Sequence, residues 1–143
     1  MENKRDNVCI ILAGYEKPMK KLFDMNEGLY SRINHHIFFE NYTSEQLYNI
    51  FKQMCKDDKY TLSNNIKQLL IDYFDIERTK ETFSNARLVR NLFEKIKIIQ
   101  AQRVVKDAKA DINLLTADDI KTTIQQLQEQ HITEQKHKIG FAT

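Results

Sequence analysis

The sequence predicts a mostly α-helical protein with a small α/β part at its N-terminal end. A continuous apolar run, VCIILA, occupies residues 8–13 and ends at Gly14, as in a strand buried on both faces of a parallel sheet. From residue 43 onward, apolar residues recur at the helical spacing of three and four positions. The 143 residues are 41% apolar and 29% charged with a single proline, a composition typical of a folded, helix-rich chain.

The N-terminal part is predicted to hold two strands, over residues 8–13 and 36–39. Between them, Pro18 is suited to the start of a helix that places Met19, Leu22 and Phe23 on one face. Two strands do not form a stable sheet alone. We therefore expect the apolar strand at 8–13 to need sheet neighbours that these residues do not supply.

Two helix starts in the rest of the chain carry capping signals. Thr43 is followed by Gln46, and Thr116 by Asp119. At this spacing the threonine hydroxyl can accept the backbone N–H of the residue three positions on, and the side chain of that residue can accept the backbone N–H of the threonine. The sequence therefore predicts that one helix begins after Thr43 and another after Thr116.

Two further helices are predicted between these, one opening near Ser63 and one over about Asn85 to Lys106. All four helices present one apolar stripe each, so they can close on a common core. The stripe positions are Leu47, Ile50, Phe51 and Met54, then Ile66, Leu69, Leu70, Tyr73 and Phe74, then Leu88, Val89, Leu92, Phe93, Ile96 and Ile99, and finally Ile120, Ile124 and Leu127.

Composition excludes several classes of function. The 22 basic residues exceed the 20 acidic ones by two and are interleaved with them, which argues against a nucleic-acid-binding face. No apolar run approaches a membrane span and no signal peptide opens the chain, so we expect a cytoplasmic protein without a membrane partner. Cys9 and Cys55 form no CxxC pair and the four histidines have no zinc spacing, so we expect two buried, reduced thiols and no metal site.

Two segments resemble a known family. IILAGYEKPMKKLFDMNEGLYSRINHHIFFENYTSEQL and SNARLVRNLFEKIKIIQAQR resemble AAA+ ATPases of the CbbX type, which include red-type rubisco activases, and equally stage V sporulation protein K and the ATPases of type VII secretion. The resemblance runs from about Met1 through Asp119 and includes the closing KIGF. It implies that residues 1–41 are the C-terminal fragment of an AAA+ α/β core, residues 42–130 a four-helix AAA+ lid, and residues 131–143 a C-terminal tail.

Two residues of the first segment match catalytic positions of the family. Arg32, in GLYSRI, matches the arginine finger, which faces the γ-phosphate held by the next subunit. A guanidinium suits that task because it offers several donors and a permanent charge. Tyr15 stands where many AAA+ proteins carry the sensor-1 residue that orients water, although a phenol is longer than the usual amide. The resemblance leaves open whether Tyr15 acts directly or packs beneath the γ-phosphate.

The second segment matches the sensor-2 motif. Arg87, in SNARLVRN, corresponds to the arginine that contacts the nucleotide of its own subunit, and it stands at a helix start, where backbone N–H groups favour an anion. Arg90 is a second nucleotide-binding candidate, with an ion pair to Glu94 as the alternative. Ser84 replaces a glycine common in the family, and we expect Ser84 to cap the helix.

The resemblance implies an ATP-driven ring, expected to be a hexamer, that remodels a protein client. ATP and Mg²⁺ are held in the family by an upstream half with a GxxxxGK[ST] loop and an acidic Walker B strand, and neither motif occurs in this sequence. We therefore expect a fragment, whether a cloned piece, a truncated reading frame or one part of a split gene. Alone it is expected to be inactive and not to bind ATP tightly.

Two other functions compete with the ATPase fragment. The alternative to the ATPase fragment is a stand-alone helical protein-interaction module without ATPase activity. A DNA-binding initiator or clamp-loader piece is disfavoured by the nearly neutral charge. The client remains unidentified, because the family's substrate-gripping segments lie upstream of the residues matched here.

Overall fold

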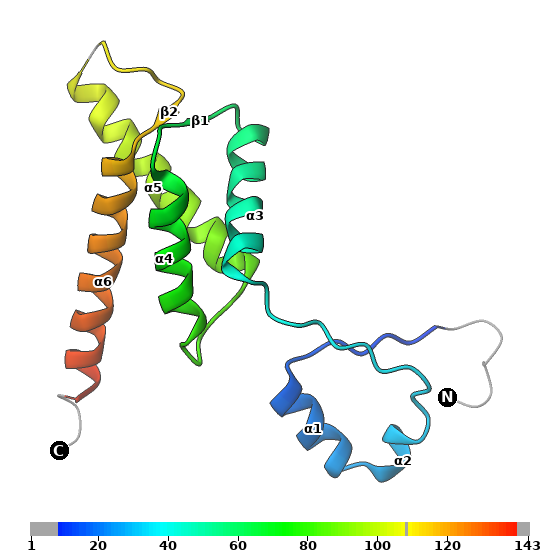
Figure 1. The fold of residues 1–143 in the computed structure, drawn as a ribbon. Helices are drawn as coiled ribbons and strands as arrows, with labels where there is room; N and C mark the ends of the chain where they lie inside the picture. The colour runs from blue at the N-terminus through cyan, green and yellow to red at the C-terminus, as the bar shows by residue number, and fades with distance from the viewer. Residues whose placement is uncertain (1–8, 108, 140–143) are drawn as a thin grey trace. The chain divides into compact units, whose positions relative to one another are not determined.

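The computed structural model describes residues 9–107 and 109–139 (Figure 1), and the chain divides into two compact units, with the boundary between Phe39 and Glu40. The first unit holds two helices, α1 (Glu16–Asp24) and α2 (Glu27–Tyr30). The elements of the second unit are α3 (Ser44–Asp57), β1 (Thr61–Leu62), α4 (Ile66–Arg78), α5 (Ala86–Lys106), β2 (Leu114–Leu115) and α6 (Ala117–Ile139). The mostly helical fold predicted from the sequence is confirmed.

Four helices pack side by side in the second unit (Figure 1): α3 lies against α4 and α5, and α6 lies against α5 and α4. At one end, β1 pairs with β2 as a short parallel ladder, with Thr61 opposite Leu114. The ladder extends by one bond, because the Ser63 N–H donates to the Leu115 carbonyl at 3.0 Å. These contacts join the connection between α3 and α4 to the connection between α5 and α6.

Both predicted capping boxes are formed. The Thr43 N–H donates to Gln46 Oε1 at 2.8 Å, and the Gln46 N–H donates to Thr43 Oγ1 at 3.2 Å. At α6, the Thr116 N–H donates to Asp119 Oδ2 at 2.9 Å and the Asp119 N–H to Thr116 Oγ1 at 3.2 Å. Four N–H groups that helix starts leave without partners are thereby satisfied.

The apolar stripes of the four helices form one core. Its buried members are Leu47, Phe51, Cys55, Ile66, Leu70, Tyr73, Phe74, Val89, Leu92, Phe93, Ile96, Leu115 and Ile120. The second helix of the unit begins at Ile66 rather than near Ser63 as predicted. The ladder bond of Ser63 keeps the chain extended there, and Asn65, with φ 68°, turns it into the helix.

A partly buried ion pair links α5 to the start of α6. Arg103 Nε lies 2.9 Å from Asp119 Oδ1, and Arg103 Nη2 donates to Asp119 Oδ2 at 3.1 Å and to the Leu114 carbonyl at 2.8 Å. Asp119 is 3% exposed. Burial opposes ionisation of this carboxyl, but the Arg103 guanidinium and the Thr116 bonds outweigh it and lower the pKa of Asp119.

Acid is expected to weaken this unit through Asp119. Because the folded pKa lies below the unfolded value of about 3.9, the stabilisation is complete above that value and is lost as pH falls through the folded pKa. Asp119→Asn removes the charge and is expected to cost about 1–3 kcal/mol at pH 7. Denaturant unfolding at pH 7, 5 and 3 measures this cost, which should shrink toward pH 3. A cost that is unchanged at pH 3 would contradict the ion pair.

In the first unit, three aromatic rings bring α1, α2 and the following segment together. The Tyr30 ring stacks on His36 with centroids 4.9 Å apart, and Phe23 meets both rings edge to face at 5.5 and 5.9 Å. Helix α1 forms in the predicted segment but begins at Glu16 rather than at Pro18, and Met19 and Phe23 are partly buried while Leu22 is exposed.

The strands predicted over residues 8–13 and 36–39 are not formed in the described part of these segments. Ile11 is 83% exposed and Phe39 is 91% exposed. The physical reason is the one given above: a strand buried on both faces needs neighbours, and none of the described residues pairs with these.

The expectation of two buried thiols is correct for Cys55 and wrong for Cys9. Cys9 is exposed because its segment has no sheet to lie in. Cys55 belongs to the core, where burial, together with Asp58, raises the pKa of its thiol to about 12. This thiol therefore stays protonated and packs as a small apolar group.

The C-terminal part differs from the predicted tail over residues 131–143. Helix α6 continues to Ile139, because residues 131–139 contain neither glycine nor proline to stop it. Residues 140–143, which include the end of the KIGF motif, lie outside the described part. Among the described residues, no helix is both long and apolar enough to cross a membrane.

Candidate functional site

Arg32 lies directly after α2 in the first unit. Its N–H donates to the Leu29 carbonyl at 3.2 Å, and the next N–H, of Ile33, donates to Tyr30 at 3.2 Å. The short turn is therefore continuous with the helix. The segment that carries Arg32 is anchored on both sides, because Tyr30 and His36 stack on each other. Arg32 is exposed, and its backbone is held by the hydrogen bonds of this turn.

Tyr15 precedes α1 in the same unit and takes its N-cap position with extended backbone angles. Its carbonyl accepts the Met19 N–H at 2.9 Å. The residue is 76% exposed. Neighbouring Gly14 is closely packed, since an added Cβ would lie 2.8 Å from Met19 Sδ. Tyr15 is thus held by its backbone while its phenol faces outward.

Arg87 and Arg90 lie one turn apart at the start of α5 in the second unit, and both are exposed. The Arg87 N–H donates to the Ser84 carbonyl at 3.1 Å. The N-cap residue is Asn85, not Ser84 as predicted, and its side chain makes no capping bond. The ion pair of Arg90 with Glu94, considered above as the alternative to a nucleotide contact, is absent among the described residues, where Glu94 pairs with Lys97 at 2.9 Å.

The Asn85 side chain is engaged elsewhere. Its Oδ1 accepts the Tyr42 N–H at 2.9 Å, and its Nδ2 donates to Asn41 Oδ1 at 2.8 Å. These two bonds connect the start of α5 with the segment that leads into α3. The first turn of α5 is therefore fixed to the entrance of the helical unit.

The described arginines fall into two groups. Arg103 is paired with Asp119, and Arg78 lies 4.0 Å from Asp75. Arg32, Arg87 and Arg90 form no ion pair with any residue that the structure describes. Their guanidinium groups remain open to an anion from outside these residues.

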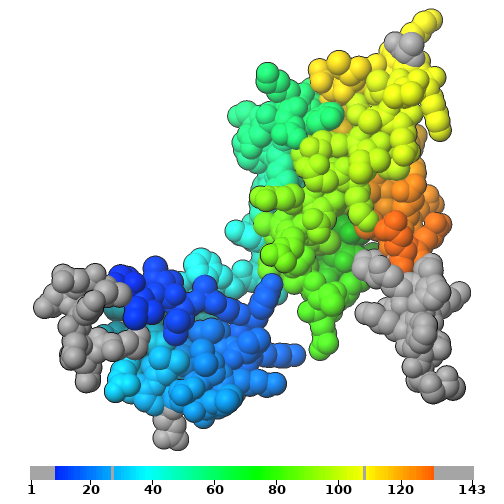
Figure 2. All heavy atoms as spheres, turned by 180° about the vertical axis from the view of Figure 1, so that it is seen from behind, coloured from blue at the N-terminus to red at the C-terminus, as the bar shows by residue number. Residues whose placement is uncertain are grey.

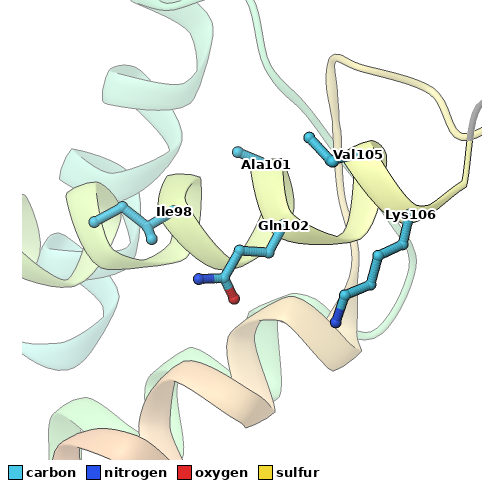
Figure 3. A pocket seen from close by; sticks show the side chains of 5 residues that line it. All are labelled: Ile98, Ala101, Gln102, Val105 and Lys106. Carbon is cyan, nitrogen blue, oxygen red and sulfur yellow. The ribbon is translucent and has the colours of Figure 1, made fainter.

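Another surface feature of α5 lies toward its C-terminal end. Figure 2 shows α5, yellow-green, open at the surface between α3 and α6. A shallow apolar hollow there is lined by Ile98, Ala101, Gln102, Val105 and Lys106, all projecting from α5 (Figure 3). Neither Arg87 nor Arg90 lines this hollow. Among the residues described, no group of three or more histidine, cysteine or acidic side chains is placed to hold a metal ion.

Comparison with known proteins decides the family. A family model described as the AAA lid domain matches residues 43–130, from the N-cap of α3 into α6. The chain belongs to the AAA lid domain family. The match begins at Thr43, whose capping box opens the four-helix unit. The second unit of the structure is thus the AAA lid domain, and the sequence-based resemblance to AAA+ proteins is confirmed.

Relatives of this AAA lid domain protein are CbbX-like. The chain is 37% identical over 130 residues to a protein CfxQ homolog of Trieres chinensis, covering 87% of this chain and 45% of the relative. It is 35% identical over 129 residues to protein CbbX of Cereibacter sphaeroides, covering 86% and 41%. It is 34% identical over 125 residues to a chloroplastic ribulose bisphosphate carboxylase/oxygenase activase of Cyanidioschyzon merolae, covering 84% and 43%. The chain therefore spans less than half the length of these relatives.

Proposed function

We propose that this chain is the C-terminal part of an ATP-hydrolysing AAA+ ring that remodels a protein client. In this role Arg87 contacts the phosphates of a nucleotide bound to its own subunit, with Arg90 as a second contact. Arg32 contacts the γ-phosphate bound to the neighbouring subunit. The observation that carries the proposal is the division of the arginines: Arg78 and Arg103 have carboxylate partners, whereas these three have none among the residues that the structure describes.

The chemistry requires this kind of group. Phosphoryl transfer spreads negative charge over the γ-phosphate oxygens, and a preorganised guanidinium stabilises that charge without changing its own protonation. Arg32 lies on a turn whose flanking residues are held by stacked rings. Arg87 lies in the first turn of α5, where the helix dipole adds a partial positive charge. Both side chains can therefore meet an anion with little further ordering of the backbone.

ATP and Mg²⁺ belong to the upstream half of the module in this proposal. Bound ATP supplies the phosphoryl group, and the phosphate loop and Walker B carboxylate hold it together with Mg²⁺. The residues described here fit only part of that task. Arg87 and Arg90 offer donors to phosphate, while the described part of the chain gathers no acidic cluster for the metal. In this proposal the described residues stabilise phosphate charge and position the nucleotide. The upstream half of the module captures ATP and Mg²⁺.

A stand-alone protein-interaction module is the second candidate. It is favoured by the core, because the buried apolar cluster lies within residues 47–120 and closes without the first unit. The coding sequence immediately upstream distinguishes the two functions. A phosphate-loop segment there, in frame or frameshifted, supports the ATPase. An unrelated gene there supports the interaction module.

Arg87→Ala is the direct test of the nucleotide contact. Residues 1–143 are joined to the ATP-binding half of a CbbX-type relative, and nucleotide affinity and turnover of the assembled ring are measured. Losing a charge-assisted bond to phosphate is expected to weaken ATP binding about tenfold or more. Arg78→Ala is the matched control and should leave affinity unchanged, because Arg78 faces Asp75. Equal effects of the two variants would refute the assignment.

A further inference from the structure

Asn85 has a backbone conformation that its residue type disfavours. Its φ is 52° and its ψ is −128°, which are the angles of the first central residue of a type II′ turn. The Arg87 N–H closes that turn on the Ser84 carbonyl at 3.1 Å. Glycine is the preferred residue at this position, since any Cβ is crowded at positive φ. The backbone alone therefore does not explain an asparagine here.

The asparagine side chain supplies what glycine lacks. Its carbonyl oxygen accepts the Tyr42 N–H and its amide nitrogen donates to the Asn41 side chain, at 2.9 and 2.8 Å. Both partners lie more than forty positions away in the sequence, in the segment that enters α3. One side chain therefore ties this entrance segment to the turn that begins α5.

We propose that Asn85 is a positioning residue that couples the entrance segment, Asn41 and Tyr42, to Arg87. Arg87 is the last residue of the turn that Asn85 shapes, and its N–H closes that turn. A displacement of the entrance segment is thereby passed to the first turn of α5 and to the guanidinium that it carries. The functional part of this inference rests on the proposed role of Arg87 in nucleotide binding.

The link itself is tested in the 143-residue chain by amide hydrogen exchange. The Tyr42 N–H should exchange slowly because it is bonded to Asn85. Asn85→Gly keeps the turn and removes both side-chain bonds, and it should accelerate Tyr42 exchange about tenfold or more. The Leu47 N–H, bonded to the Thr43 carbonyl at 2.9 Å, should not change. If Tyr42 exchanges equally in both proteins, Asn85 only forms the turn and the inference is overturned.

Asn41→Ala is the matched second variant. It removes the bond between Asn85 Nδ2 and Asn41 Oδ1 and leaves residue 85 and its backbone unchanged. Tyr42 exchange should rise by less than in Asn85→Gly, because the bond from the Tyr42 N–H to Asn85 Oδ1 remains. If Asn41→Ala accelerates Tyr42 exchange as much as Asn85→Gly does, the bond from the Tyr42 N–H to Asn85 Oδ1 does not hold the entrance segment. That result would overturn the two-bond link.

Coupling to Arg87 is tested in the ring formed with the ATP-binding half. Asn85→Gly should raise the KM for ATP by about five- to tenfold with a smaller effect on kcat, because it misplaces a binding group without removing it. In an Arg87→Ala background the same change should add nothing, since the two residues act as one unit. Additive effects, or an unchanged KM, would overturn the coupling. If Arg87→Ala alone leaves KM normal, the nucleotide role of Arg87 fails, and the exchange result shows separately whether the link exists.

Discussion

Replacing Arg32 by alanine is expected to lower ATP turnover about a thousandfold or more in a ring made of this chain joined to the ATP-binding half of a CbbX-type relative. Nucleotide binding should stay nearly intact. The proposed contact forms with charge that develops on the γ-phosphate oxygens during transfer, so its loss raises the barrier more than it weakens the ground state. Single-turnover hydrolysis and equilibrium nucleotide binding measure the two quantities separately.

Mixed rings distinguish action across the subunit boundary from action within a subunit. Subunits carrying Arg32→Ala are combined with subunits whose own phosphate loop is disabled but whose Arg32 is intact. If Arg32 acts on the neighbouring subunit, the mixed ring should recover turnover that neither ring shows alone. Arg78→Ala, which removes a guanidinium that faces Asp75, should turn over normally. Normal turnover of the Arg32→Ala ring would show that the finger is assigned to the wrong residue.

Leu92→Ala is expected to destabilise the lid by about 2–5 kcal/mol, the cost of removing a buried leucine side chain and leaving a cavity. Leu92 is 1% exposed and lies in the core cluster. Phe93 and Ile96 beside it on α5 are equally enclosed, so collapse around the cavity is limited. Denaturant unfolding followed by circular dichroism measures the free energy of unfolding.

Ile98→Ala is the matched control on the same helix. Ile98 is 59% exposed, so trimming it should change the free energy of unfolding by less than about 0.5 kcal/mol. Both variants shorten an aliphatic side chain to alanine within α5, so the main difference between them is the burial of the side chain that is removed. Ile98 lines the apolar hollow on α5. If Ile98→Ala proves as costly as Leu92→Ala, Ile98 is buried in solution, and the hollow is therefore covered.

The four lid helices could be predicted because their signals are local. Capping boxes at Thr43 and Thr116 depend on residues three positions apart, and an amphipathic stripe repeats within one turn. Helix α5 shows how far such signals go: Val89, Leu92, Phe93 and Ile96 are all buried as its stripe predicts. Burial of Gln100, which donates to the Ile112 carbonyl at 2.8 Å, was not predicted, because its partner lies outside the helix.

Features that depend on distant partners were missed. The strands β1 and β2 have two residues each, too few for an alternating pattern to be visible. The pair of Arg103 with Asp119 joins residues sixteen positions apart, and nothing at either position marks the other. The strands expected at residues 8–13 and 36–39 were predicted from their apolar runs. Such a run does not show whether a neighbouring strand is present to pair with it.

Among the candidate site residues, the sequence indicated Arg32, Arg87 and Arg90 through their motifs but not the hydrogen bonds and ring contacts around them. Asn85 was predicted only as the beginning of a helix. Nothing in the sequence marks position 85 as a turn residue with positive φ, so a second task for its side chain could not be predicted. The two bonds to Asn41 and Tyr42 become visible only when the entrance segment is placed beside α5.

The parallel ladder of β1 and β2 has a mechanical consequence. It joins the ends of two helical hairpins, α3 with α4 and α5 with α6, so that these ends cannot separate from each other without breaking the bonds of Thr61 and Ser63. A force that pulls the two hairpins apart at this end is therefore resisted by backbone bonds as well as by the shared apolar core.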